Sequence, residues 1–283
     1  MGGIVLVAKP AGPTSHDVVD IVRRTLGEQR VGHLGTLDPF AKGLLVLVVG
    51  RATRLATFAT EWPKSYDGVI RLGVTTDTDD VTGSVVATAP WTAITPSQLA
   101  EVIGKFRGRY EQRPPAYSAV KIEGERAYRR ARRGETVEPA ARPVEIRELE
   151  IVEAAVPDLE FRATVSGGTY LRSLARDIGA ALGCGAHLSA LRRTAVGPFR
   201  LEEAVAPEAV TPAAVRDASI LVADLPRRNV NRTERDAVVH GRPLARTSGG
   251  AQGRVALFAD DELLGVAECV GEVLKPRVVV AEE

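Results

Sequence analysis

Cysteine and histidine are scarce in this chain of 283 residues, which holds two cysteines and four histidines. Cys184 and Cys269 stand far apart, so we expect no disulfide framework. Cys184 and His187 lie close together in GCGAH, but a structural zinc site needs four clustered ligands. The other histidines are scattered along the chain, at His16, His33 and His240. We therefore expect no metal site.

Long apolar runs are also missing. Segments such as Gly3–Ala8 (GIVLVA) are far shorter than the ~20 residues of a membrane-spanning helix. No early stretch combines a basic start, an apolar centre and a small-residue cleavage site, as a secretory leader does. We expect a cytoplasmic protein with no membrane partner. The hydrophobic fraction of 45% is that of a globular protein long enough to bury a sizeable core.

Net charge is nearly absent, at +1, yet the charge is unevenly distributed. The segment from Lys105 to Arg133 holds ten basic residues against three acidic ones. A solvated helix face would explain such a stripe. An RNA phosphate partner would explain it too, and the preference for arginine favours this, because a guanidinium binds phosphate through a planar fork.

Apolar patterning predicts strands and helices in no strict βαβ order, which indicates an α+β fold with a mostly antiparallel mixed sheet. We expect a helix over 15–26 with Ser15 as its cap, and a hairpin made of Tyr66–Gly73 and Ser84–Ala87. Further strands are expected at 3–8, 44–49, 144–153, 159–165 and 187–196, and further helices at 51–60, 96–106, 125–133, 170–182 and after Leu201. Near Leu225 the sequence changes to short strand-like segments separated by glycine-rich turns. We expect one domain over 1–224 and a small β-rich domain over 225–283.

One aspartate, Asp38, lies in a loop whose neighbouring residues restrict the backbone. In GHLGTLDPFAKG, Asp38 follows Gly32 and Gly35 and precedes Pro39, so the backbone turns sharply before it and is restricted after it. A surface aspartate needs no such frame, whereas a catalytic nucleophile or base does. Arg172, at the start of a helix in SGGTYLRSLARDIG, is a candidate partner that would keep this carboxylate ionised.

Two other patterns could suggest chemistry. Ser15, His16 and Asp17 spell a hydrolase triad, but consecutive residues cannot adopt the geometry of one. The acidic segment TTDTDD, at 75–80, could collect a divalent cation or simply form a turn in which Asp and Thr bond their own backbone. We favour the turn.

Four ordered motifs resemble one family, the bacterial tRNA pseudouridine-55 synthases of the TruB type. They are GHLGTLDPFAKGLLVLVVGRATRL, KSYDGVIRLGVTTDTDDVTG, RPPAYSAVKIEGERAYRRAR and SGGTYLRSLARDIGAALGCGAHLSALRRTAVGPF. The resemblance covers about residues 3–199 closely. It implies an enzyme that detaches uracil from its ribose, rotates it and rejoins it through carbon five, with no cofactor or metal.

The resemblance also assigns roles residue by residue. Asp38 matches the nucleophile, Arg172 its paired arginine, and Tyr66 the aromatic residue that stacks on the target base and moves a proton. The remaining matches are expected to contact substrate: His33 near the space that the base vacates, Tyr170 and Leu191 against the flipped base, and Lys64 in the motif of Tyr66. Whether Asp38 attacks the ring or the sugar is left open by the sequence.

The basic stripe matches the family's RNA-gripping thumb, an insertion at about 105–142. Its expected RNA contacts are Arg126, Arg129, Arg130, Arg132 and Arg133. Residues 225–283 resemble, more loosely, an RNA-binding PUA-like module. The implied partner is the T-arm of tRNA, bound by a monomer without a guide RNA. The rival interpretations are an RNA chaperone with this fold, and an aspartate-nucleophile hydrolase, for which no second acid or metal cluster is evident.

Overall fold

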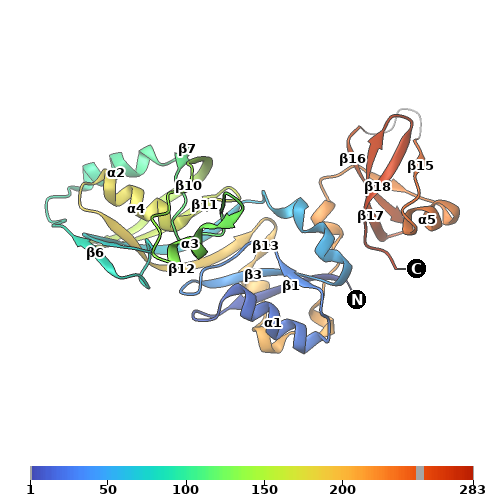
Figure 1. Cartoon of the computed structure of the whole chain (residues 1–283), viewed down its shortest axis with the longest axis horizontal. Coiled ribbons are helices and arrows are strands. Elements are labelled where there is room, and N and C mark those ends of the chain that lie inside the picture. The colour runs from blue at the N-terminus through green and yellow to red at the C-terminus, as the bar shows by residue number, and fades with distance from the viewer. Residues whose placement is uncertain (1, 247–251, 283) are drawn as a thin grey trace.

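The computed structural model describes residues 2–246 and 252–282, which form two large sheets joined end to end and two small two-stranded sheets (Figure 1). The larger sheet has nine strands, and its neighbouring pairs are antiparallel except β3 with β12. Its main order is β1 (Gly3–Lys9), β3 (Lys42–Val49), β12 (Ala186–Val196), β4 (Lys64–Leu72), β11 (Asp158–Val165), β10 (Arg142–Ala155) and β7 (Gly108–Gln112). Strand β2 (Val31–His33) pairs with β3, and β13 (Phe199–Arg200) pairs with β12. The expected α+β fold with a mostly antiparallel mixed sheet is confirmed.

Strand β3 is covered on both faces, which explains its continuous apolar sequence. Leu45 and Leu47 pack with α1 (Ser15–Leu26), whereas Leu44 and Val46 pack with the 3-10 helix η1 (Gly50–Ala59). The loop that carries Asp38 joins β2 to β3. One end of that loop is therefore anchored in the most deeply buried strand of the sheet.

The other half of the sheet is covered on one face only. Helices α4 (Leu171–Ala181) and α2 (Pro96–Lys105) pack there over Tyr66 and Ile70 of β4. The alternate residues Asp67 and Arg71 are only half-buried or exposed, so β4 shows the period of two typical of a strand with one wet face.

Some local expectations were wrong. Strand β4 pairs with β11 and β12, while the second half of the expected hairpin, β6 (Val85–Thr88), pairs with β5 (Val74–Thr76). The chain leaves β4 at Gly73, whose φ of +80° turns it away. The helix expected at 51–60 is present, as a 3-10 helix over residues 50–59. After Leu201 come four short 3-10 turns (Leu201–Glu203, Pro207–Ala209, Pro212–Ala214 and Ser219–Val222), and the α-helix α5 (Arg232–Val239) follows.

The insertion between β7 and β10 contains a small hairpin, β8 (Lys121–Ile122) with β9 (Glu125–Arg126), and a short helix, α3 (Ala127–Arg132). These elements lie within residues 105–142, the segment for which the family resemblance implies a thumb, and we use that name for it below. The expected helix at 125–133 is shorter than predicted, because its first two residues belong to β9.

The second sheet has five strands in the order β14 (Arg227–Asn229), β16 (Arg254–Ala259), β17 (Glu262–Val270), β18 (Val273–Val279) and β15 (Leu244–Ala245). One of its faces shares a core with η1, since Ala256 and Phe258 cluster with Leu55. The Arg51 and Arg54 side chains of η1 also donate to the backbone carbonyls of Ala281 and Val279. Apolar packing thus joins the two sheets. No helix among the described residues is long and apolar enough to cross a membrane.

Candidate active site

The Asp38 loop is held from three sides by buried polar side chains. The Ser15 hydroxyl accepts from the Leu37 N–H at 2.8 Å and donates to the Leu37 carbonyl at 2.9 Å. The Lys9 ammonium, 1% exposed, donates to the carbonyls of Ala41 at 2.8 Å and Pro39 at 3.3 Å. Both neighbours of Asp38 in the chain are therefore tied to other elements.

Arg193 of β12 also binds the Asp38 loop. We call Lys9, Ser15 and Arg193 together the frame of this loop. The Arg193 guanidinium is 1% exposed and donates to the carbonyls of Leu44 at 2.7 Å, Gly35 at 3.1 Å and Thr36 at 3.2 Å. A Cβ atom on Gly43 would strike the Arg193 backbone, so the loop and β12 touch directly. Gly35 and Gly43 have φ of +135° and +113°, values that favour glycine, while Gly32 lies in an ordinary backbone region. The predicted sharp turn is at Gly35.

Ser15 does not cap α1. Thr14 is the cap, in a reciprocal capping box with Asp17. The Ser15 hydroxyl is free to bind the Asp38 loop because the cap lies one residue earlier. SHD is therefore not a triad: Ser15 is structural, and Asp17 is bound to Thr14.

The Asp38 carboxylate is paired with Arg172 in a bidentate fork. The Arg172 Nε donates to Oδ2 at 2.9 Å, and a terminal nitrogen donates to Oδ1 at 3.1 Å. Arg172 is 6% exposed, whereas Asp38 is 30% exposed. The cation is thus fixed inside the protein, and one side of the carboxylate faces solvent, where a substrate atom can reach it.

Helix α4 gathers two further loops at this pair. Arg172 also donates to the carbonyl of Thr78 at 3.1 Å and to that of Tyr117, at the root of the thumb, at 3.0 Å. One turn later, Arg176 pairs with Asp79 at 3.0 Å and donates to the Arg113 carbonyl at 2.8 Å. One helix face therefore binds the Asp38 loop, the TTDTDD turn and the segment RPPAYS, the last through the carbonyls of Arg113 and Tyr117.

Sequence reasoning missed Asp80, a buried second carboxylate 3.7 Å from the Arg172 guanidinium. Its Oδ1 accepts from the hydroxyls of Thr78 at 2.8 Å and Thr82 at 2.5 Å, so TTDTDD is a turn, as expected. Lys9 and Arg193 were also missed. A lysine ending the first apolar strand and an arginine within an apolar strand are the only local signals for them, since their partners lie far away in the sequence.

Burial and nearby cations set the charge around Asp38. Burial lowers the pKa of Lys9 to about 8, and the negative charge of Asp38 partly opposes this shift. Burial, followed by the Arg193 cation, lowers the pKa of His33 below its usual range, so this ring is neutral at pH 7. The His33 Nδ1 accepts from the Gly35 N–H at 3.3 Å, which leaves Nε2 to donate.

The expected base-contacting residues lie in different settings. Tyr66 of β4 and Leu191 of β12 are buried in the same core cluster as Leu37, the neighbour of Asp38. Tyr170 precedes α4, with its backbone bonded by Gln112 and its ring 5.0 Å from the Arg142 guanidinium. The ammonium of Lys64 instead points to the carbonyls of Trp62 and Thr60, at 3.0 and 3.4 Å, and burial lowers its pKa to about 8.

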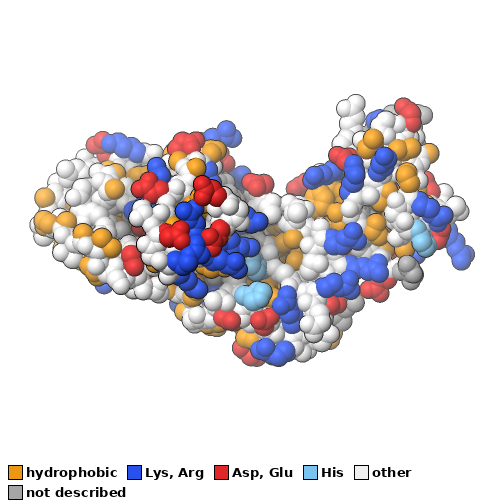
Figure 2. Space-filling view, viewed as in Figure 1, with side chains coloured by type: hydrophobic (Ala, Val, Ile, Leu, Met, Phe, Trp, Pro, Cys, Tyr) orange, Lys and Arg blue, Asp and Glu red, His pale blue; other side chains and the backbone are white. Residues whose placement is uncertain are grey.

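The thumb arginines lie on an exposed surface, with acidic side chains around them (Figure 2). Arg130 and Arg133 pair with glutamates of the thumb, and Arg132 lies over the Tyr128 ring at 5.6 Å. Arg126 and Arg129 are exposed and have no carboxylate partner among the described residues. The sequence placed these arginines together correctly, but not their partners.

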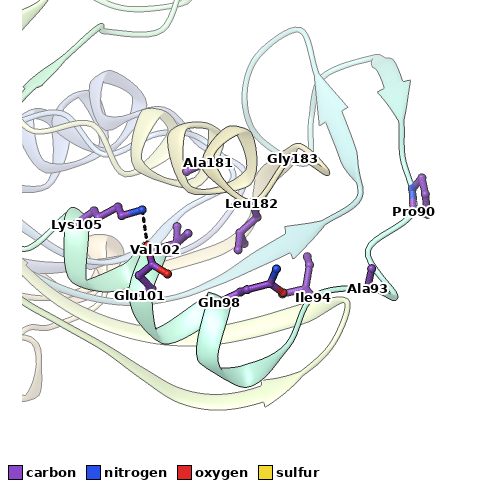
Figure 3. Close-up of a pocket in the computed structure, with 10 residues that line it drawn as sticks. All are labelled: Pro90, Ala93, Ile94, Gln98, Glu101, Val102, Lys105, Ala181, Leu182 and Gly183. Atoms are coloured by element: carbon purple, nitrogen blue, oxygen red, sulfur yellow. Dashed lines mark ion pairs between the residues drawn. The ribbon is translucent and has the colours of Figure 1, made fainter.

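Two other features do not contribute to this site. A cavity of about 310 Å³ lies between α2 and the end of α4, lined by Val102 and Leu182 and rimmed by the Lys105–Glu101 ion pair (Figure 3). It contains none of the predicted site residues. In the described part of the chain no three His, Cys, Asp or Glu side chains could hold a metal. His187 is bonded to the Val74 carbonyl, and the Cys184 thiol points to the Gly185 carbonyl.

Comparison with known proteins identifies the family of this chain. Residues 23–171 match the TruB family pseudouridylate synthase N-terminal domain, and residues 172–230 match the tRNA pseudouridylate synthase B C-terminal domain. The tRNA pseudouridine synthase B of Mycobacterium sp. (strain KMS) is 46% identical over 269 residues, which cover 92% of this chain and 89% of the relative. That of Thermobifida fusca (strain YX) is 44% identical over 290 residues, covering 99% and 98%.

Solved structures extend the likeness to the fold. The chain aligns with the crystal structure of a Cbf5-Nop10-Gar1 complex with a TM-score of 0.74 and 28% identity, over 99% of this chain and 85% of that one. An H/ACA RNP bound to a substrate RNA containing 2'-deoxyuridine gives a TM-score of 0.72 at 25% identity, with the same coverage. Both family domains match in order, and the relatives align over nearly their whole length. The chain belongs to the TruB family of pseudouridylate synthases.

Proposed function

We propose that this protein is a tRNA pseudouridine synthase that isomerises the T-loop uridine at position 55, with Asp38 as its nucleophile. The observation that carries this proposal is the fixed Asp38–Arg172 pair. Asp38 Oδ1 and Oδ2 both accept from a buried guanidinium, and the loop around them is bound by Lys9, Ser15 and Arg193. A carboxylate so oriented is ready to attack without reorganising.

The reaction needs no other reactant. The bond between the ribose C1′ and uracil N1 breaks, uracil rotates, and a bond between C1′ and C5 forms. The hydrogen on C5 is lost as a proton and N1 gains one, so substrate and product are isomers. Asp38 forms a transient bond to the ring or to the sugar while uracil turns, and leaves as the new bond is completed.

Tyr66 is proposed to stack on the flipped uracil and to move the C5 proton. Its ring is buried in the core cluster that also contains Leu37 and Leu191, and among the described residues its hydroxyl makes no hydrogen bond. Extrusion of a stacked base costs a few kcal/mol, of which an aromatic platform recovers about 1–3 kcal/mol. Tyr170 and Leu191 are proposed to contact the flipped base, and His33 to lie near the space it vacates. Lys64 is proposed to contact substrate beside Tyr66.

The thumb, 105–142, and the C-terminal domain, 225–283, are proposed to bind the T-arm and the adjoining tRNA backbone. This division at residue 225 follows the second sheet, whose first strand begins at Arg227. We propose that the enzyme acts as a monomer in the cytoplasm on tRNA alone, without a guide RNA or cofactor. Its Cbf5 neighbours are longer, since the alignment leaves 15% of those chains uncovered.

The test is to incubate the purified protein with an unmodified tRNA transcript and map pseudouridine at single-nucleotide resolution. We expect conversion at uridine 55 only, in the absence of metal. A transcript with that uridine replaced by cytidine is the control. Folding of tRNA without any conversion would instead support the RNA-chaperone interpretation and contradict the proposed function.

A further inference from the structure

The thumb arginines do not all present free guanidinium groups to RNA. Arg130 is paired with Glu135 at 2.8 Å and with Glu123 at 3.2 Å. Arg133 forms a fork with Glu125, at 2.6 and 2.8 Å, and a further bond with Glu135 at 2.7 Å. In Figure 2 the acidic side chains surround the basic ones on this surface. Two of the expected RNA contacts are thus already occupied by carboxylates.

Glu123, Glu125 and Glu135 occupy these positions through the backbone of the thumb. Glu123 has φ of +52° and precedes Gly124 at φ +87°, so a non-glycine residue takes a left-handed conformation at the tip of the β8–β9 hairpin. This conformation is unfavourable for a residue with a side chain, and it persists where surrounding contacts hold it in place. Glu135 contacts both arginines and thereby joins the two pairs into one network.

A carboxylate oxygen accepts from a guanidinium in the same geometry as a phosphate oxygen. RNA that replaces one glutamate therefore gains little, because it exchanges one charge-assisted bond for another. It also places a phosphate beside the displaced carboxylate, where like charges repel. Since Glu135 bridges Arg130 and Arg133, its full release requires two phosphates at once.

We infer that Glu123, Glu125 and Glu135 are specificity-determining residues, which compete with RNA phosphates for Arg130 and Arg133 and admit only RNA that satisfies both arginines together. A folded tRNA arm presents phosphates at fixed spacing and displaces the network in one step. A flexible strand must order two phosphates to do so, which adds an entropic penalty. Arg126 and Arg129 lie outside the network and can bind phosphates of either kind of RNA, so their contacts do not discriminate between a folded arm and a flexible strand. This inference rests on the proposed function of the thumb as a tRNA-binding element.

The test compares affinities for an unmodified tRNA transcript and for polyadenylate of equal length, which has no uridine to flip. The triple variant E123Q/E125Q/E135Q removes the competing charges but keeps side-chain size. Its matched control is E111Q/E150Q/E153Q, three exposed glutamates of the same domain that pair with no arginine among the described residues. Both variants change the net charge by the same amount, so a general electrostatic effect appears in both.

We expect the triple variant to bind polyadenylate about tenfold more tightly and tRNA at most about threefold more tightly. Its slope of log affinity against log salt on polyadenylate should steepen by about 1.4, since two extra contacts to a single strand contribute ~0.7 each. The control should change both affinities less than twofold. Conversion of tRNA by the parent is measured alongside, so that failure of the proposed activity is seen separately.

An equal gain for both RNAs, in the triple variant alone or in both variants, would overturn the inference. So would a loss for both RNAs, which would mean that the glutamates only fold the thumb. Limited proteolysis within 113–142 identifies that case, because an unfolded thumb is cut faster in the triple variant than in the control.

Discussion

Arginine is used in two opposite ways in this molecule. In the candidate active site, here called the centre, Arg172 and Arg193 are buried, and their partners come from loops and strands that are remote in the sequence. In the thumb, the side chains of Arg130 and Arg133 are 26% and 50% exposed, and their partners are glutamates within the same small insertion. Long-range buried contacts fix one geometry, whereas local exposed contacts can be exchanged for others.

The energies of the two kinds of contact differ accordingly. Breaking a buried pair strands a charge in the interior, at about 3–5 kcal/mol. An exposed pair contributes about 0–1 kcal/mol and is screened by salt. The centre is therefore assembled before RNA arrives, and the thumb can rearrange as RNA binds. Substitutions in the two regions should affect different measurements.

The largest effect is expected for Asp38→Asn, which keeps the loop but removes the charge and the nucleophile. Single-turnover pseudouridine formation should fall ~10⁴-fold or more, equal to roughly 5.5 kcal/mol of barrier. Affinity for tRNA should persist, because the phosphate contacts lie in the thumb. Turnover within about tenfold of the parent would show that Asp38 only shapes the loop.

Arg172→Met should lower the single-turnover rate at least ~10²-fold, since Asp38 loses the fork that orients it. It should also lower the free energy of unfolding by about 3 kcal/mol, because Asp80 is left without its buried cation. Arg172→Lys is the control: it restores the charge but not the fork, so stability should recover more than rate. Equal recovery of both would contradict an orienting role.

Arg193→Met tests whether the frame of the loop contributes to stability and rate in addition to the Asp38–Arg172 pair. The loop would lose three charge-assisted bonds to backbone carbonyls, and we expect a loss of at least about 3 kcal/mol in unfolding free energy. The rate should fall ~10–10²-fold. The adjacent Arg192, half-exposed and paired with Asp67, gives a matched control, Arg192→Met, with less than about 1 kcal/mol expected. Similar losses in both variants would argue against the frame.

The contrast between local and long-range contacts also explains how far the sequence could predict the structure. The α+β fold and the long strands were predictable, because apolar periodicity is a local signal. The Asp38–Arg172 pair followed from the resemblance of the ordered motifs to one family, which suggested a partner far along the chain. The hairpin assigned to β4 was wrong, because alternation identifies a strand but not its partner. The 3-10 turns after Leu201 were predicted as helices, although Pro207 and Pro212 break that region into short pieces.

Within the site, the sequence predicted the residues proposed to act on the substrate but not the residues that hold them in place. Lys9 and Arg193 are single polar residues at the end of or within apolar segments, whereas Asp80 ends the polar turn TTDTDD. The targets of all three are backbone carbonyls or a guanidinium far along the chain. The charge count over 105–133 also left out Glu135, which is bonded to both Arg130 and Arg133.

Lys9 gives a pH-dependent prediction for the centre. Its pKa of about 8 means that the positive charge near Asp38 is lost above that pH, so the single-turnover rate should fall about tenfold by pH 9.

The free energy of unfolding should change in the opposite direction. The unfolded state still binds this proton up to a pKa near 10.5, so the contribution of Lys9 to stability rises with pH between about 8 and 10.5. Lys9→Met should abolish the alkaline fall. Lys64→Met is the control, because Lys64 also has a pKa of about 8 but does not contact the Asp38 loop through its ammonium.

The smallest effect is expected for Arg129→Ala in the thumb, where an exposed arginine without a carboxylate partner is removed. If Arg129 contacts one phosphate of the folded T-arm, the slope of log affinity against log salt should flatten by ~0.9. The ratio of parent to variant affinity should then shrink about 3.5-fold between 50 and 200 mM salt, which follows from that slope. Neither the pH profile nor the single-turnover rate at saturating enzyme should change, because the centre is assembled without the thumb arginines. Arg147→Ala, on β10 and paired with Glu145, serves as the control for general loss of positive charge. A salt slope identical to that of the parent would place Arg129 on a solvated helix face and leave the tRNA grip to other residues.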